Sequence, residues 1–186
     1  ERYQLTDFTI LFVGRFVELK GIRYLIEALK LLSDDKLEFK AIIAGDGPLK
    51  KELNSFVDQN KLTASIIFPG WVSRSDLRDH LTTASVLVAP SLSEAQGLVF
   101  VEALACGTPA IGTNIGGIPD MVRNDVNGYL VAPESPQEMY ERLKFMIENP
   151  KTVTRFKKAA RASVVDRFSW ESVTQKYQSL IEEVVR

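Results

Sequence analysis

Residues 85–114 read SVLVAPSLSEAQGLVFVEALACGTPAIGTN, and this stretch decides the fold. It opens with an apolar run at 85–91. A helix-length segment follows at 98–107, where Gly107 stops it, and a second strand-length run spans 108–114. The two runs are largely apolar rather than alternating, which is typical of strands buried on both faces. A strand, a helix and a second strand of this kind predict a parallel pair joined by a right-handed crossover.

The same alternation of strand and helix extends in both directions from this unit. No internal repeat, low-complexity tract or linker interrupts it, so residues 1–186 are expected to form a single domain. The expected fold is α/β, a Rossmann-like doubly wound parallel sheet with helices on both faces. The other strands are expected at 8–14, 39–48, 65–71 and 128–133, the other helices at 21–32, 49–60 and 74–84, a short helix from Gly117, and three helices between Ser135 and Arg186, with Pro136 in the first turn of the first and Asn149-Pro150 as the break before the second.

Composition excludes several classes of function. The 23 basic and 24 acidic residues give a net charge of −1, so the chain lacks the positive field that nucleic acid binding usually needs. His80 is the only histidine and Cys106 the only cysteine, so a catalytic triad and a tetrahedral zinc site both lack residues. We expect His80 on an exposed helix face and Cys106 as a small buried hydrophobe.

The same features bear on the compartment. A single cysteine rules out an internal disulfide and favours a reducing compartment. No apolar run approaches the ~20 residues of a membrane span, and the polar start ERYQLTD does not resemble a signal peptide. The sequence therefore predicts a cytoplasmic protein.

Ligands of doubly wound sheets bind beyond the carboxyl ends of the strands, so the loops that follow strands are the candidate sites. The first such loop reads VGRFVELKG (13–21) and contains Gly14, Arg15 and Lys20. Two cations among glycines suit an anionic phosphate group. An ordinary solvated loop explains the same residues equally well, and the loop alone does not decide between the two.

The loops after the second and third strands give weaker signals. In AGDGP (44–48), Asp46 either caps the following helix or contacts a ligand. In FPGWV (68–72), Trp71 and Val72 offer an apolar surface for a flat base, with backbone groups of Val72 at the edge of that base. A place in the core is nevertheless the better expectation for an aromatic residue, and we predict it for Trp71.

The strongest signal is EAQGLVFVE (94–102), which follows the fourth strand. We expect the helix to begin near Gly97, so that its free amides stabilise a phosphate. Glu94 then lies just before the helix and Glu102 about one turn inside it, with their carboxylates on the order of 10 Å apart. That separation suits a long ligand with hydroxyls at both ends and phosphate between them. Alternatively, Glu94 is a helix N-terminal charge and Glu102 a surface residue, although the apolar neighbours of Glu102 indicate that its charge needs a partner.

Together these segments resemble the nucleotide-sugar-binding half of retaining glycosyltransferases with two Rossmann-like domains, the GT-B fold, and specifically glycosyltransferase family 4. The most specific motif is a glutamate, seven residues, a second glutamate and then ALACGTPAI. The chain therefore resembles the C-terminal half of a GT-B fold. The resemblance covers almost the whole chain, through VGRFVELKG, IIAGDGP, FPGWV, the stretch from Pro90 to Val122, NGYLVAP and RFSWESVTQKY.

The resemblance implies where the diphosphate of a nucleotide sugar binds. Arg15 and Lys20 match the basic pair that grips it, beside the turn at Gly14. No metal and no other cofactor is expected, because these cations would neutralise the phosphate charge. Further contacts to the phosphates are expected from the amides around Gly97, Leu98 and Val99.

The two glutamates match residues that bind the two ends of the ligand. Glu94, the catalytic candidate, corresponds to the glutamate that contacts the hydroxyls of the transferred sugar, and Glu102 to the one that binds the ribose. The backbone of Val72 is expected at the base. One position departs from the family, because Gln96 stands where an aromatic, commonly phenylalanine, precedes the glycine. Gln96 either hydrogen-bonds the sugar or simply tolerates exposure.

The implied reaction is transfer of a hexose-type sugar from a UDP- or GDP-sugar to a carbohydrate or lipid-linked acceptor, with retention at the anomeric carbon. Two alternatives stay open. A nucleotide-sugar epimerase would use the same site. A non-catalytic nucleotide-binding module would have no use for Glu94 near a sugar.

Members of the family also have an N-terminal domain that holds the acceptor. This chain starts about where their second domain would start. The expected partners are therefore the nucleotide sugar and the protein's own N-terminal domain, with peripheral contact to the cytoplasmic face of a membrane through that domain. The isolated chain is expected to bind the nucleotide sugar weakly and to turn over little or nothing. Its end, RFSWESVTQKYQSLIEEVV, resembles the helix that packs back across the first domain in the family.

Overall fold

Six parallel strands form one sheet, in the order β3-β2-β1-β4-β5-β6. The computed structural model describes residues 8–184. This order is the doubly wound, Rossmann-like arrangement that the sequence predicts. The strands are β1 (Thr9–Val13), β2 (Lys40–Ala44), β3 (Ile66–Gly70), β4 (Val86–Ala89), β5 (Ala110–Thr113) and β6 (Gly128–Val131).

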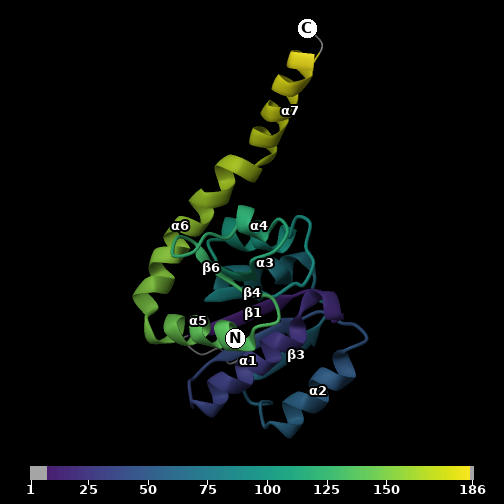
Figure 1. Cartoon of the computed structure of the whole chain (residues 1–186), viewed down its shortest axis with the longest axis vertical. Coiled ribbons are helices and arrows are strands. Elements are labelled where there is room, and N and C mark those ends of the chain that lie inside the picture. Colours follow the sequence, from purple (N-terminus) through teal and green to yellow (C-terminus); the bar gives the residue numbers. More distant parts are fainter. Residues whose placement is uncertain (1–7, 185–186) are drawn as a thin grey trace.

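Helices connect the strands and extend the chain beyond the sheet (Figure 1). The predicted helices are confirmed, including the three that follow β6. A short turn of 3-10 helix between β1 and α1, η1, was not predicted. The helices are η1 (Glu18–Lys20), α1 (Ile22–Asp34), α2 (Lys50–Gln59), α3 (Arg74–Thr83), α4 (Leu98–Ala105), η2 (Ile118–Asp120), α5 (Pro136–Glu148), α6 (Pro150–Phe168) and α7 (Trp170–Val184).

Local sequence signals account for several helix ends. Pro136 and Pro150 occupy the first positions of α5 and α6, where the missing N–H costs nothing. The Ser73 hydroxyl caps α3 by accepting a hydrogen bond from the Asp76 amide. Gly107, just after α4, has the left-handed φ of +80° that ends many helices.

The short helix expected from Gly117 is limited to the single 3-10 turn η2. The Asn127 side chain is responsible for its end. Its carbonyl oxygen accepts from the Arg123 amide at 2.7 Å, and its amide group donates to the Met121 carbonyl at 2.8 Å. These bonds satisfy the backbone groups that a longer helix would have paired internally.

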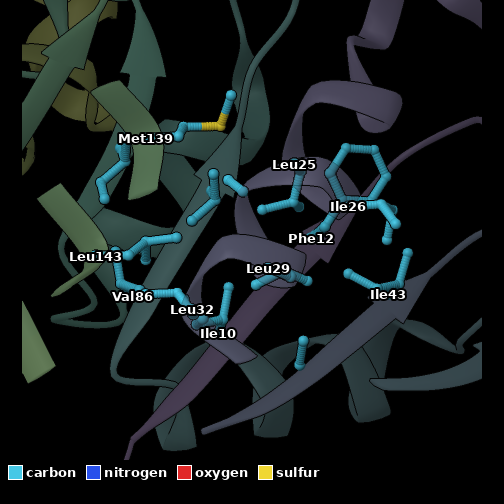
Figure 2. Packing of buried hydrophobic residues seen from close by; sticks show 14 of the residues in the cluster. Ile10, Phe12, Leu25, Ile26, Leu29, Leu32, Ile43, Val86, Met139 and Leu143 are labelled. Carbon is cyan, nitrogen blue, oxygen red and sulfur yellow. The ribbon is translucent and has the colours of Figure 1, made fainter. Parts of the chain in front are cut away.

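Helices cover both faces of the sheet, and each face has its own apolar core. On one face, α1, α2 and α5 pack over the sheet, and Figure 2 shows Ile10 and Phe12 of β1 in this layer. On the other face, α3 and α4 pack over Leu11 of the same strand. Helix α6 contributes Phe156 to the first core and Val164 to the second. Because successive strand residues point to opposite faces, burial on both sides requires strands that are apolar throughout.

Helix α7 projects away from the sheet (Figure 1). None of its residues is buried. The family resemblance implies that this segment packs across a first domain. Residues 8–184 do not test that prediction. The exposed large apolar side chains on α7 are Trp170, Tyr177, Leu180, Ile181 and Val184.

Two glycines allow the loops at the carboxyl edge of the sheet to touch backbone to backbone. A Cβ at Gly21, after β1, would lie 1.9 Å from the carbonyl oxygen of Pro90, after β4. A Cβ at Gly116, after β5, would lie 2.0 Å from the carbonyl oxygen of Glu94. Both glycines also have left-handed φ, +61° and +49°. No other residue fits either position, so these glycines fix the loop around Glu94 from two sides.

Substitution of Gly116 tests this constraint on stability. We expect Gly116→Ala to lower the free energy of unfolding by well over 2 kcal/mol, because about 1–2 kcal/mol of left-handed strain adds to the backbone clash. Gly70→Ala is the matched control, since Gly70 has a φ of +78° but open space around its Cβ position. Urea unfolding followed by circular dichroism measures both variants. Equal losses would mean that the clash contributes nothing.

Candidate functional site

The candidate site lies at the carboxyl ends of β1 and β4, the two strands where the chain order of the sheet reverses. β1 pairs with β2 on one side and with β4 on the other, so the loops after β1 and β4 leave the sheet as neighbours. The Leu92 amide donates to the Leu19 carbonyl at 2.8 Å and joins these loops. A reversal of this kind is where doubly wound sheets bind ligands.

The Glu94 carboxylate is the centre of the hydrogen bonds in this site. Lys20 Nζ donates to its Oε2 at 2.6 Å, and the Gly97 amide donates to its Oε1 at 3.1 Å. The Ser91 hydroxyl lies 3.5 Å from Oε2. The structure thus brings Lys20, Glu94 and Gly97 together, although Lys20 and Glu94 are 74 residues apart in the chain.

These contacts control the charge of Glu94. Its side chain is 16% exposed. Burial raises the pKa of Glu94, but the hydrogen bond and charge of Lys20 and the bond from the Gly97 amide together outweigh it, so the pKa lies below its ordinary value of 4.5. Glu94 is therefore a carboxylate at neutral pH.

Helix α4 begins where the sequence predicts and leaves two amides without an acceptor. Gly97 is the N-cap, with a φ of +62°, and Leu98 is the first helical residue. The Gly97 amide is held by Glu94, and the Phe100 amide donates to the Gly97 carbonyl. The amides of Leu98 and Val99 donate to no acceptor among residues 8–184. Two hydrogen-bond donors at the positive end of a helix dipole thus adjoin the Lys20–Glu94 pair.

Gln96 and Leu98 flank Gly97, the N-cap of α4. They line a hollow of about 400 Å³ at the junction of α6 and α7, opposite Phe168 and Trp170. Leu98 is 67% exposed there. In this structure, the residue that replaces the usual family aromatic is exposed beside an apolar hollow.

Glu102 lies in α4, eight residues after Glu94. It is exposed and lines a groove of about 320 Å³ between α3 and α4, together with Arg74 and Arg78. The apolar neighbours that indicated a need for a partner lie on another face of the helix, where Phe100, Ala103 and Leu104 are buried. Glu102 therefore lies at the surface, in a groove that is open to solvent. At 100° per residue, sequence neighbours on a helix do not share an environment.

The remaining predicted residues also lie at the carboxyl edge of the sheet. Gly14 donates its amide to the Ala44 carbonyl at 3.0 Å, which ties the loop after β1 to the end of β2. The exposed Arg15 side chain makes no hydrogen bond or ion pair with the described part of the chain. Val72 is half-buried two residues after β3.

The prediction of a core position for Trp71 is wrong. Its side chain is 68% exposed. β3 is the edge strand of the sheet and the chain leaves it at Gly70, so Trp71 follows a strand that has only one neighbour. Two smaller expectations also change, because His80 and Cys106 are both half-buried rather than exposed and buried, respectively.

Asp46 does not cap α2. Its carboxylate accepts from the Gly47 amide at 2.7 Å and from Lys50 Nζ at 2.6 Å. The Asp46 carbonyl accepts from the Phe16 amide at 2.9 Å, which ties the loop after β2 to the loop after β1. Its role in the structure is therefore to hold a turn.

Sequence reasoning missed four residues that contribute to the site. The sequence predicts only a short helix from Gly117 here, whereas Gly116 supports the Glu94 backbone. Ser91 was not singled out, although a serine three residues before a glutamate is within reach of its carboxylate. Arg74 and Arg78 lie one helical turn apart, a spacing that places two cations on one face.

Comparison with known proteins agrees with this geometry. The family model described as Glycosyl transferases group 1 matches residues 2–163. The chain belongs to this family. Its structural neighbours are GT-B glycosyltransferases, which confirms the predicted fold class.

Individual relatives match most of this chain. An uncharacterised glycosyltransferase of Methanocaldococcus jannaschii is 34% identical over 174 residues, 94% of this chain and 48% of that protein. Anabaena HepE, solved in complex with UDP and glucose, has a TM-score of 0.83 at 26% identity and covers 95% of this chain and 48% of its own. The C-terminal domain of the group 1 glycosyl transferase LpcC from Francisella tularensis has a TM-score of 0.82 at 28% identity, covering 89% and 88%. The chain spans about half the length of the curated relatives it matches.

Within residues 8–184, no three His, Cys, Asp or Glu side chains are grouped so that they could hold a metal ion. No helix in that range has the length and apolar character to cross a bilayer.

Removal of Lys20 tests the electrostatics of the site. We expect Lys20→Met to lower the free energy of unfolding by about 1 kcal/mol near neutral pH, because it leaves the Glu94 carboxylate without its cation. The pKa of Glu94 is lowered in the folded state, so its contribution is complete above 4.5 and disappears as pH falls through the folded pKa. Urea unfolding of both proteins from neutral pH down to about pH 3 measures the difference. Lys51→Met, on an exposed position of α2, is the control. A difference that does not change with pH would contradict the assignment.

Proposed function

We propose that this chain is the nucleotide-sugar-binding domain of a retaining glycosyltransferase. The reaction moves a hexose-type sugar from a UDP- or GDP-sugar to a carbohydrate or lipid-linked acceptor. The observation that carries the proposal is the Lys20–Glu94 pair, which adjoins the unpaired Leu98 and Val99 amides at the strand reversal. Family membership and the UDP and glucose named for the Anabaena neighbour support it.

The diphosphate is proposed to bind between the loop after β1 and the start of α4. Lys20 and the exposed Arg15 supply positive charge from one side. The Leu98 and Val99 amides supply donors and the positive end of the helix dipole from the other. As the bond between the sugar and the β-phosphate breaks, negative charge grows on the leaving nucleoside diphosphate. These groups stabilise that charge, and no divalent metal is proposed.

Glu94 is proposed to contact the hydroxyls of the sugar and to hold its anomeric carbon beside the leaving phosphate. A carboxylate with a lowered pKa accepts hydrogen bonds from hydroxyls and also stabilises positive charge that develops on the sugar ring. The acceptor oxygen attacks from the side that the phosphate leaves, so the anomeric configuration is retained. Glu94 forms no covalent bond in this proposal.

The rest of the nucleotide is proposed to extend from α4 toward β3. Glu102 receives the ribose hydroxyls in the groove between α3 and α4. The backbone of Val72 contacts the base, and the exposed Trp71 beside it offers a flat apolar face. The edge position of β3 leaves this loop open to a ligand.

The acceptor is proposed to bind outside this chain. Curated relatives are about twice as long as their match to it. The remainder of the full-length protein is proposed to supply the second half of the site. Contact with the cytoplasmic face of a membrane is proposed for that remainder when the acceptor is lipid-linked.

Thermal shift with a panel of nucleotide sugars tests the proposal. UDP- and GDP-linked hexoses, with ADP- and dTDP-linked ones for comparison, are titrated against the protein in EDTA and again with Mg²⁺. At least one is expected to raise the melting temperature with concentration, equally in both buffers, since only binding to the folded state gives such a shift. No shift with any of them would overturn the proposal, and a shift that needs Mg²⁺ would overturn its metal-free form.

Product analysis with the full-length protein then tests transfer itself. The linkage formed is expected to keep the anomeric configuration of the donor sugar, which NMR of the product reads directly. Inversion would contradict the mechanism. A nucleotide sugar with an altered sugar and no transfer would identify an epimerase.

Arg15→Met separates ligand binding from folding. We expect about tenfold weaker binding of the nucleoside diphosphate, about 1.4 kcal/mol. The free energy of unfolding is expected to stay unchanged, because Arg15 makes no hydrogen bond or ion pair with the described residues. Isothermal titration calorimetry and urea unfolding measure the two quantities. Lys51→Met removes a comparable exposed charge away from the site. Equal effects of the two variants on binding would indicate only a nonspecific charge effect.

A further inference from the structure

The Glu94 carboxylate holds hydrogen-bond donors that a diphosphate would need. Lys20 Nζ lies 2.6 Å from its Oε2, and the Gly97 amide nitrogen lies 3.1 Å from its Oε1. Under the proposed function, Lys20 faces the phosphates, and the Gly97 amide lies beside the Leu98 and Val99 amides that bind them. Glu94 therefore forms, within the chain, the kind of contacts that the ligand's phosphate forms on binding.

The Glu94 carboxylate and a bound phosphate compete for these donors and do not share them. A backbone amide has one hydrogen, so the Gly97 N–H serves either Glu94 or a phosphate oxygen. Lys20 has three N–H groups, but a phosphate drawn to it also approaches the Glu94 carboxylate, and like charges at this range repel strongly where water is partly excluded. Diphosphate binding thus weakens the contacts that keep Glu94 charged.

The backbone around Glu94 cannot move away to relieve this competition. The Gly117 amide donates to the Glu94 carbonyl at 3.2 Å. Gly116 packs against the same carbonyl so closely that no Cβ would fit. Only the side chain of Glu94 is free to turn, from Lys20 toward the sugar.

A sugar on the diphosphate changes the balance. A carboxylate that is displaced from Lys20 while only 16% exposed needs new hydrogen-bond donors. Hydroxyls of the transferred sugar supply these donors at Glu94. A nucleoside diphosphate lacks that sugar and supplies none there. Loss of the sugar in the reaction returns Glu94 to competition with the product.

We propose that Glu94 discriminates between substrate and product by acting as an internal competitor of the diphosphate, which weakens the binding of the nucleoside diphosphate relative to the nucleotide sugar and promotes product release. This inference rests on the proposed function and adds to it a second role for the same carboxylate.

Calorimetric titration of wild-type protein and Glu94→Gln with UDP and UDP-glucose, and with GDP and GDP-mannose, tests the inference. For the nucleotide that binds, the variant is expected to bind the nucleoside diphosphate about tenfold tighter and the nucleotide sugar no tighter than wild type. The dissociation constant of the nucleoside diphosphate, divided by that of the nucleotide sugar, therefore falls by at least about tenfold. Glu148→Gln, which removes an exposed carboxylate from the end of α5, is expected to change neither constant.

A second comparison removes the competing cation. In a Lys20→Met background, Glu94→Gln is expected to tighten binding of the nucleoside diphosphate much less, because the main shared donor is gone. This double-mutant cycle isolates the competition from any general change in the site. Circular dichroism and the melting temperature establish that each variant is folded.

The possible results separate this inference from the proposed function. If folded Glu94→Gln binds the nucleoside diphosphate more weakly than wild type, or equally well, Glu94 is not a competitor of the diphosphate. The proposed function would stand, because it requires only that wild type binds a nucleotide sugar. If Glu94→Gln does not fold, Glu94→Ala in the same titration decides the question. Binding of no nucleotide by wild type would overturn the proposed function, and this inference with it.

Discussion

The pairing of β1 with two neighbours is the constraint on which the rest of the structure depends. Its ladder to β2 and its ladder to β4 place the chain's reversal in the middle of the sheet. Burial on both faces follows, because α1 and α2 pack on one side of the sheet and α3 and α4 on the other. The loops after β1 and β4 are consequently neighbours. This places Lys20 of the first loop beside Glu94 of the second.

Close backbone contacts then hold these loops in place. Gly21 lies against the Pro90 carbonyl, and Gly116 against the Glu94 carbonyl, at separations that only glycine permits. The loop that carries Glu94 is thereby held between the loops after β1 and β5. A rigid backbone under a charged side chain gives a site in which ligand binding exchanges hydrogen bonds instead of reshaping loops.

The Lys20–Glu94 pair connects this architecture with function. In the folded chain it satisfies two charges that are largely removed from water. In the proposed reaction the same cation meets the diphosphate and the same carboxylate meets the sugar. In this proposal, one pair of residues links stability, affinity and product release, since each contact to the ligand replaces a contact within the chain.

The sequence by itself determined the order of strands and helices, the parallel sheet and the start of α4, because these depend on apolar runs, helix caps and glycines that act locally. It also identified loop residues that lie at the carboxyl edge of the sheet. Only the tertiary structure decided that Trp71 is exposed and that Glu102 is solvated on a groove, since both depend on which neighbouring elements cover a residue. The contact between Lys20 and Glu94 was likewise decided in three dimensions, because it joins side chains 74 residues apart whose distance is set by strand pairing and not by any local pattern.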